Sequence, residues 1–219
     1  MLKWEKKLID WFNRHMLLIA GIFVVLAAGW MRMAGRNYVG NDYHCSLYDV
    51  PGNCNALLFR RLGDFLMLHF ADTTIALLKM LAYGGDFAVA LLALVICRKK
   101  TALQNVLILA AFLLSPVTLL YSVSGMKMDS VCMSLLLLGF LSFRNQLPVL
   151  GVLFAAAAGF LYPPYWPVSI GFGICMFIRK SRRSPFTLQW GLAALLMAAS
   201  LLLSIFLEQQ GGSFWGKIF

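Results

Sequence analysis

Two short polar clusters interrupt a strongly apolar chain, and both contain side chains that could do chemistry. The first cluster holds Arg36 and Asp42, and the second holds Lys127 and Asp129. A carboxylate at a membrane–water boundary can act as a general base on a hydroxyl when partial burial raises its pKa towards neutrality. A lysine or arginine nearby can neutralise the charge of a lipid phosphate. The two clusters together therefore predict a site.

Each acidic residue also has a structural interpretation. Asp42 could be a solvated aspartate of a loop, and the nearby Asp49 is a weaker candidate for the same catalytic role. Asp129 could cap the apolar helix that follows it. Lys79 and Asp86 lie seven residues apart within an apolar segment, and therefore on roughly one face of a helix. Charges inside a membrane are costly enough to indicate a function or a partner. We expect Asp86 to pair with another helix or to line a water-filled cavity, whereas Lys79 can extend towards the membrane surface.

Residues 162–167 form an aromatic and proline-rich turn, with the sequence Tyr-Pro-Pro-Tyr-Trp-Pro. Prolines break a helix, and tyrosine and tryptophan are common where a helix meets the membrane surface. The same rings could also stack on a sugar or flank an isoprenoid chain. Both interpretations of this turn stay open at this point.

Membrane helices must position all of these residues. The chain is 61% hydrophobic and only 13% charged, with a mean hydropathy of +0.78, which is too apolar for a soluble globular protein of 219 residues. Because lipid offers no hydrogen bonds, each spanning segment must satisfy its own backbone, which favours helices. The expected fold is all-α, a polytopic membrane bundle of about seven transmembrane helices in one domain, 1–219. The expected spans are 16–33, 73–96, 102–121, 130–143, 147–162, 165–178 and 190–207.

Basic residues assign the two sides of the membrane. Most of the 19 lysines and arginines flank the predicted spans on a single side, which the positive-inside rule makes cytoplasmic. The N-terminus, 1–15, then lies in the cytoplasm, and the loop 34–72 and the tail 208–219 lie outside with both polar clusters. We expect an integral, multi-pass protein of the cell membrane. Its net charge of +10 reflects this orientation and favours contact with membrane lipids rather than with nucleic acid.

The long outer loop has two further features. Residues 55–70 fit an amphipathic helix lying on the membrane surface. Cys45 and Cys54 share this loop, where oxidising conditions would permit a disulfide. The sequence contains no CxxC pair, no His-rich cluster with metal spacing, and no glycine-rich phosphate loop. We therefore expect neither a metal nor a cofactor.

Taken in order, these features resemble the GT-C class of polytopic glycosyltransferases, which use polyprenyl-phosphate-linked sugars. In that class a long loop after the first helix holds an essential acidic residue, and a later proline precedes an acidic residue that opens another helix. The branch of glycosylphosphatidylinositol mannosyltransferases then has a Tyr-Pro-x-x-Tyr-like turn. Here Asn41-Asp42-Tyr43, the stretch 116–130 and the turn 161–167 follow the same order. The chain departs from the class in lacking Asp-x-Asp in the first loop and in having fewer predicted spans than many members.

The resemblance implies an inverting membrane glycosyltransferase that moves a sugar from a polyprenyl phosphate to a hydroxyl of a lipid or surface glycan, on the extracytoplasmic face. Asp42 would be the catalytic base. Arg36 and Lys127 would offset charge on the departing phosphate, and Asp129 would orient the acceptor or the lysine. The lipid would lie beside the aromatic turn. The residues expected to bind substrate are Arg36, Lys127, Asp129, Tyr162, Tyr165 and Trp166.

Two other classes of function stay open. The chain could be a non-catalytic membrane subunit whose tail, 211–217, packs against a second membrane protein that supplies further helices. It could also be a lipid or small-solute transporter in which Lys79 and Asp86 are the working residues. The absence of an internal repeat makes the transporter the weakest of the three hypotheses.

Overall fold

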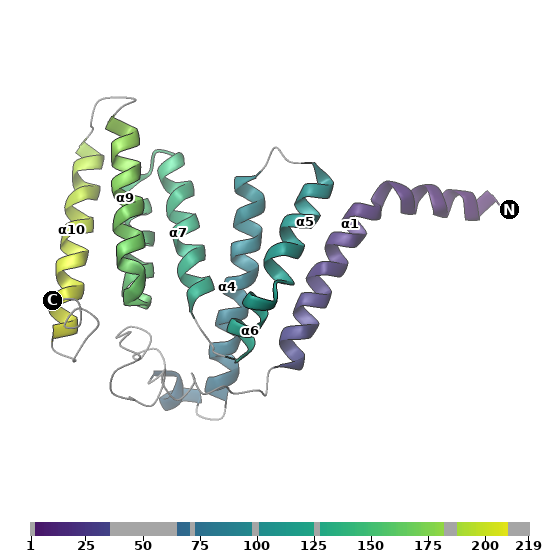
Figure 1. Ribbon diagram of the computed structural model, residues 1–219, viewed down its shortest axis with the longest axis horizontal. Coiled ribbons are helices and arrows are strands. Elements are labelled where there is room, and N and C mark those ends of the chain that lie inside the picture. The colour runs from purple at the N-terminus through teal and green to yellow at the C-terminus, as the bar shows by residue number, and fades with distance from the viewer. Residues whose placement is uncertain are drawn as a thin grey trace.

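The computed structural model describes residues 3–35, 65–70, 73–97, 101–124, 128–181 and 188–209, and the elements within these ranges are helices. Most of them stand side by side, as Figure 1 shows, with α1 at one edge of the row and α10 at the other. The elements are α1 (Lys3–Ala34), α4 (Thr74–Ile96), α5 (Ala102–Leu113), α6 (Pro116–Ser124), α7 (Asp129–Arg144), α8 (Pro148–Leu161), the 3-10 turn η2 (Pro163–Tyr165), α9 (Trp166–Ser181) and α10 (Leu188–Gln209).

Local sequence signals set several of these helix boundaries. Thr101 begins α5 with a capping box, in which its hydroxyl accepts from the Gln104 backbone N–H and its own N–H donates to the Gln104 side chain. Pro148 stands in the first turn of α8, where a proline loses no helical hydrogen bond. Between α7 and α8, Gln146 adopts a positive φ of 64°, which turns the chain back on itself.

Within the described ranges, four segments are long and apolar enough to cross a membrane. They are His15–Ala34, Thr74–Ile96, Ala102–Leu120 and Leu188–Phe206. Large apolar side chains such as Phe23, Leu91 and Leu202 are exposed on them. Extensive exposed apolar surface of this kind is what a lipid-facing helix presents. The chain therefore has the character of a membrane protein, as its composition indicates.

The prediction of seven spans is not supported by the helix lengths. The helices α7, α8 and α9 form where the fourth, fifth and sixth spans were expected, but they contain only 16, 14 and 16 residues. At the α-helical rise these lengths correspond to roughly 21–24 Å, which is less than the ~30 Å of a hydrocarbon core. The turns at 145–147 and 162–165 end α7 and α8, respectively. The predicted segments match these helices to within three residues at each end, but the prediction that each of them crosses the membrane is not supported.

Helix α4 joins two packed groups. On one side it packs against α7, which packs in turn against α8, and α8 contacts α9 and α10. The core of this larger group includes Leu78 of α4, Cys132 of α7 and Ala155 of α8. On its other side α4 packs against α5, and α5 packs against α1, with Ala28, Ala90 and Leu113 as the buried cluster. Small residues dominate several of these contacts, which lets the helix backbones approach closely.

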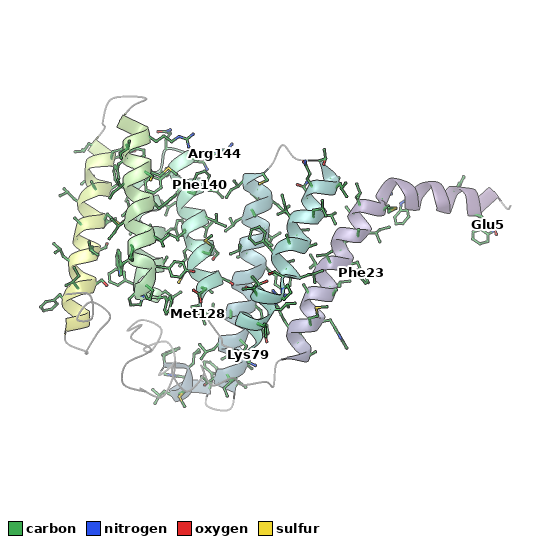
Figure 2. All side chains as sticks on the ribbon, viewed as in Figure 1. Glu5, Phe23, Lys79, Met128, Phe140 and Arg144 are labelled. Atoms are coloured by element: carbon green, nitrogen blue, oxygen red, sulfur yellow. The ribbon has the colours of Figure 1, made fainter. Side chains whose placement is uncertain are left out.

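The two ends of the bundle differ in the residues that they present. At one end, called here the Asp129 end, α1 finishes, α4 and α7 begin, and η2 lies between α8 and α9. At the opposite end, called the Arg144 end, α4 and α7 finish and α5 and α8 begin. Figure 2 labels Lys79 and Met128 towards the first end and Arg144 at the second. The predicted outer features Asp129 and 162–166 thus share one end of the bundle, as expected.

Several predictions fall outside the described residues. These concern Arg36, Asp42, Asp49, the disulfide between Cys45 and Cys54, Lys127, and the tail 211–217. Of the predicted amphipathic helix at 55–70, the structure describes 65–70, and those residues are helical.

Candidate functional site

At the Asp129 end, the start of α7 meets the turn between α8 and α9. The hydroxyl of Tyr165 donates a hydrogen bond shared between the Asp129 carboxylate, with 3.2 Å between Tyr165 Oη and Asp129 Oδ1, and the Asp129 carbonyl oxygen, at 3.3 Å. Burial, reinforced by the charge of Asp129, raises the pKa of the Tyr165 hydroxyl above its ordinary value. The hydroxyl therefore stays protonated near neutral pH and remains a donor to Asp129.

The prediction that Asp129 caps α7 is wrong in its geometry. Met128 occupies the capping position, and no side-chain hydrogen bond caps this helix. Asp129 is instead the first residue of α7, where its negative charge interacts favourably with the positive end of the helix dipole. Its carboxylate is directed to Tyr165, so it ties α7 to the aromatic turn.

Core packing holds the aromatic turn in place. Tyr162 ends α8 in an extended conformation, Pro163 and Pro164 begin η2, and Trp166 begins α9. The Trp166 ring is fully buried, and a Cβ added to Gly159 would lie 2.5 Å from it. The structure therefore places Trp166 in the core, whereas Tyr162 and Tyr165 keep partly exposed side chains that a ligand could reach.

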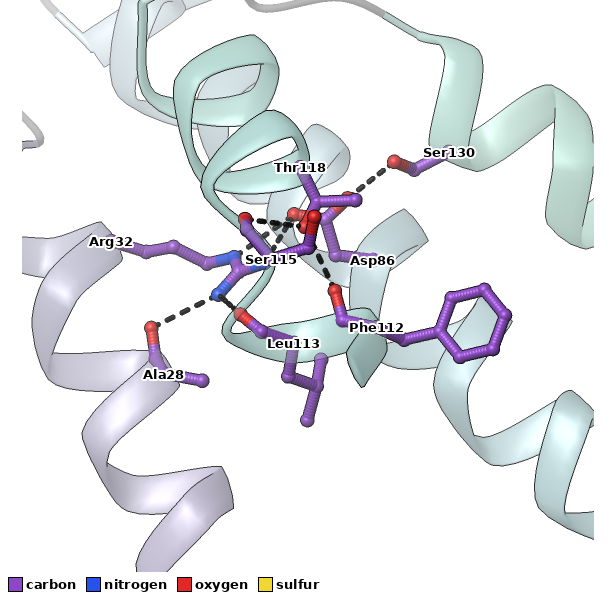
Figure 3. Close-up of polar contacts among 8 residues, drawn as sticks. All are labelled: Ala28, Arg32, Asp86, Phe112, Leu113, Ser115, Thr118 and Ser130. Atoms are coloured by element: carbon purple, nitrogen blue, oxygen red, sulfur yellow. Dashed lines mark hydrogen bonds and ion pairs between the residues drawn. The ribbon is translucent and has the colours of Figure 1, made fainter. Parts of the chain in front are cut away.

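A second polar cluster lies deeper in the bundle and is drawn in Figure 3. Arg32 of α1 forms an ion pair with Asp86 of α4, with 2.7 Å from Arg32 Nη2 and 2.9 Å from Arg32 Nε to Asp86 Oδ2. Both side chains are only 1% exposed. The other Asp86 oxygen accepts a hydrogen bond from the hydroxyl of Ser130, on α7. Of the two alternatives predicted for Asp86, pairing with another helix is the one that the structure shows.

Side chains donate hydrogen bonds to the backbone carbonyls that are left free at the break between α5 and α6. Because Pro116 has no N–H, the carbonyl of Phe112 loses its helical partner, and the hydroxyl of Thr118 donates to it at 2.8 Å. The neighbouring carbonyl of Leu113 accepts from Arg32 Nη1 at 2.9 Å. In lipid a free carbonyl is expensive, so these bonds explain how a span can contain a break. Arg32 of α1 therefore links its own helix to α4 and α5.

Sequence reasoning missed Arg32 and Ser130 as partners of Asp86. Arg32 falls in the last turn of α1 and inside the first predicted span, 16–33, and no role was predicted for it. A cation in one span and an anion in the next would have been the only signal for the pair. Lys79, expected to extend to the surface, is buried, and its Nζ donates to the Gly35 carbonyl at 3.1 Å. It links the start of α4 to the end of α1.

The Asp129–Tyr165 contact and the Arg32–Asp86 ion pair are both connected to the first turn of α7. Asp129 is bonded to the aromatic turn, and the adjacent Ser130 is bonded to the Arg32–Asp86 pair. The first turn of α7 is therefore hydrogen-bonded on one side to the aromatic turn and on the other to the ion pair. The helix ends that flank the undescribed Arg36, Asp42 and Lys127 also lie at the Asp129 end. Within the described part of the chain, no group of histidine, cysteine, aspartate and glutamate residues could hold a metal ion.

In its described residues the chain is a helical protein of membrane character, with a buried ion pair between its helices. Comparison of the chain with protein-family models, with curated proteins and with solved structures found no match. The resemblance to the GT-C class therefore depends on the sequence motifs alone.

The contact between Asp129 and Tyr165 leads to a first prediction. Replacing Tyr165 with phenylalanine should lower the free energy of unfolding by about 1–2 kcal/mol, because it removes a hydrogen bond to a charged group that is partly buried. A double-mutant cycle with Asp129→Asn, followed by thermal unfolding in detergent, isolates this contact. A coupling energy near zero would contradict the contact.

The same contact predicts a dependence on alkaline pH. Since the pKa of Tyr165 is raised in the folded chain, the unfolded chain ionises first, near the ordinary tyrosine value of about 10. The stabilising contribution of Tyr165 is therefore complete below pH ~10 and is lost as the pH rises through the folded pKa. Tyr165→Phe should lose less stability than the parent chain between neutral and alkaline pH, as unfolding midpoints measured across that range would show.

Proposed function

We propose that this chain is a membrane glycosyltransferase that moves a sugar from a polyprenyl-phosphate donor to a hydroxyl of a lipid or surface glycan, with inversion. The observation that supports it best is the contact between Asp129 and Tyr165. It brings together two of the three segments in which the sequence resembles the GT-C class, although 36 residues separate them in the chain. The third segment, around Asp42, follows α1, which ends at the same end of the bundle.

In this proposal, Asp42 accepts the proton of the acceptor hydroxyl while the hydroxyl oxygen attacks the anomeric carbon. The bond from that carbon to the phosphate oxygen breaks, and the polyprenyl phosphate leaves with the electron pair. Arg36 and Lys127 offset the negative charge on the leaving group. Asp129, held by Tyr165, orients the acceptor or the lysine. The isoprenoid chain lies beside Tyr162 at the membrane boundary.

A non-catalytic subunit is the second candidate, and the short helices favour it. The helices α7, α8 and α9 are too short to cross a membrane unaided, yet they expose Met133, Leu153 and Val168. A second membrane protein could cover these side chains and supply further spans. In that case the chain would contribute structure to a shared complex rather than a site of its own.

Sugar transfer by the purified chain in lipid nanodiscs tests the proposal. The donors would be a panel of polyprenyl-phosphate hexoses, beginning with the mannose derivative, and the product would be identified by mass spectrometry. Asp42→Asn should lower transfer at least ~100-fold, the usual contribution of a general base, with no change in the unfolding temperature. Asp49→Asn is the matched control, since it removes a second aspartate from the same loop, and it should keep full transfer.

Each other outcome points to a different class of protein. Transfer that persists in Asp42→Asn removes this residue from the mechanism. A wild-type chain that is inactive alone, but that co-purifies stoichiometrically with a second membrane protein and functions fully as Asp42→Asn, is a subunit. Lipid or solute flux that Asp86→Asn abolishes, without any sugar transfer, identifies a transporter.

A further inference from the structure

The N-terminal part of α1 differs from the rest of the helix in its surroundings. Although α1 is continuous from Lys3 to Ala34, its candidate membrane span begins only at His15. Figure 1 shows that the preceding part bends and runs away from the other helices, near the level of the Arg144 end. Trp4 and Trp11 in this part are 61% and 53% exposed. Two tryptophans are therefore exposed on a part of α1 that leaves the bundle.

The register of this helix separates apolar from charged positions. At roughly 100° per residue, positions 4, 8, 11, 12 and 15 fall along one side of the helix, and they are Trp, Leu, Trp, Phe and His. Positions 3, 6, 7, 10, 13 and 14 fall along the opposite side, and they are Lys, Lys, Lys, Asp, Asn and Arg. The charged side thus has four basic residues and one acidic residue, and Glu5 and Ile9 fall at the boundary between the two sides. A strongly basic side opposite an aromatic side is the pattern of a helix that lies in a membrane interface.

Two contacts join this part of α1 to the span. The rings of Trp11 and His15 stack with 4.8 Å between their centroids, and His15 Nδ1 lies 2.8 Å from the Trp11 carbonyl oxygen. The aromatic side of the helix is therefore continuous with the beginning of the membrane-spanning segment. An apolar side that continues into the bilayer is placed to enter the acyl boundary, where tryptophan side chains are favoured.

We propose that residues 3–14 form an interfacial helix that binds a layer of anionic lipid headgroups. The aromatic side faces the acyl chains and the basic side faces the headgroups. The Arg144 end is rich in basic residues, because α7 finishes there with Arg144 and the sequence between α4 and α5 reads Arg-Lys-Lys. This positive charge favours an anionic partner. Basic residues near an anionic surface each add binding energy, and the effect decreases with added salt. This inference does not depend on the proposed transferase activity.

Quenching of the two exposed tryptophans in the full-length chain tests the proposal. The chain contains six tryptophans, so the difference between it and the Trp4→Phe, Trp11→Phe double variant isolates the signal of these two. The chain is reconstituted in bilayers of phosphatidylcholine alone or mixed with phosphatidylglycerol. With phosphatidylglycerol present, lipids brominated near the headgroup should quench the isolated signal, and aqueous acrylamide should quench it weakly.

Charge variants then identify the headgroups as the partner. Replacing Lys3, Lys6 and Lys7 together with glutamate should raise the acrylamide quenching constant at least about twofold in the anionic bilayer, whereas the matched triple replacement with arginine should leave it unchanged. Added salt should raise the acrylamide quenching constant of the parent chain towards that of the glutamate variant. The proposal is overturned if acrylamide quenches both variants equally, or if the signal is the same with and without phosphatidylglycerol. Unfolding temperatures of both variants in detergent confirm that the chain remains folded.

Discussion

Replacing Arg32 with methionine is expected to lower the free energy of unfolding by about 3–5 kcal/mol, because Asp86 would then be a buried charge without a counter-charge. The two side chains are 1% exposed and only 2.7 Å apart. The substitution also removes the donor to the carbonyl of Leu113, at the break that follows α5. Methionine keeps an unbranched apolar side chain, so the loss comes mainly from the missing charge and hydrogen bonds.

The double variant Arg32→Met, Asp86→Leu should recover most of this loss. Removing both members of a buried ion pair is often close to neutral, whereas removing one of them is strongly destabilising. The recovery should be incomplete, since Ser130 and Leu113 would each keep an unpaired polar group. Detergent unfolding of the parent, both single variants and the double variant completes the cycle.

Arg144→Met is the matched control for this experiment. Arg144 is exposed at the end of α7, and the same substitution there should change the stability by no more than about 0.5 kcal/mol. If Arg32→Met were as mild as Arg144→Met, water would have to reach the ion pair and solvate Asp86. A wet centre of that kind would favour the transporter hypothesis over the glycosyltransferase.

The ion pair shows what could and could not be predicted from the sequence. A carboxylate in an apolar span requires a partner, so the pairing of Asp86 was predictable from its position alone. The identity of the partner was not, because it depends on how α1 and α4 are placed in depth relative to each other. That register is set by packing around Ala28 and Ala90, which no local pattern encodes.

The number of spans was overestimated for a related reason. Apolar composition predicts that a segment is helical, and this was correct for α7, α8 and α9. Whether a helix crosses a bilayer depends on its length, which here is limited by the turns next to Pro148 and Pro163. Pro116, inside the predicted third span, was likewise a usable signal for the break between α5 and α6.

The candidate site was predicted as a set of residues rather than as a geometry. Asp129 and Tyr165 were both chosen from the order of the motifs, and the structure brings them into contact. Their hydrogen bond could not be derived from spacing, because it requires α7 and α8 to pack antiparallel with the aromatic turn at the start of α7. The burial of Trp166 could not be predicted for the same reason, since it depends on the packing of its ring against Gly159 in the preceding helix.

Adjacent glycines in α4 should respond in opposite ways to alanine. A Cβ at Gly85 would lie 2.7 Å from the Val131 backbone nitrogen and 3.0 Å from the Ser130 carbonyl carbon. Those atoms belong to the backbone of α7 and cannot move aside as a flexible side chain would, so Gly85→Ala should lower the free energy of unfolding by about 1–3 kcal/mol. A Cβ at Gly84 would meet nothing within 4 Å. Gly84→Ala should therefore be neutral, or stabilising by up to ~1 kcal/mol through helix propensity.

The pair of variants separates the packing of α4 on α7 from the proposed chemistry. In Gly85→Ala the first turn of α7 is pushed away from α4, which weakens the bond from Ser130 to Asp86 and displaces Asp129 from the aromatic turn. Unfolding in detergent should show the difference in stability whether or not the chain transfers sugar. If sugar transfer is observed, Gly85→Ala should lower it in protein that remains folded, and Gly84→Ala should not. Equal unfolding midpoints for the two variants would mean that α4 and α7 do not approach each other at Gly85, and the link between the ion pair and the candidate site would then be lost.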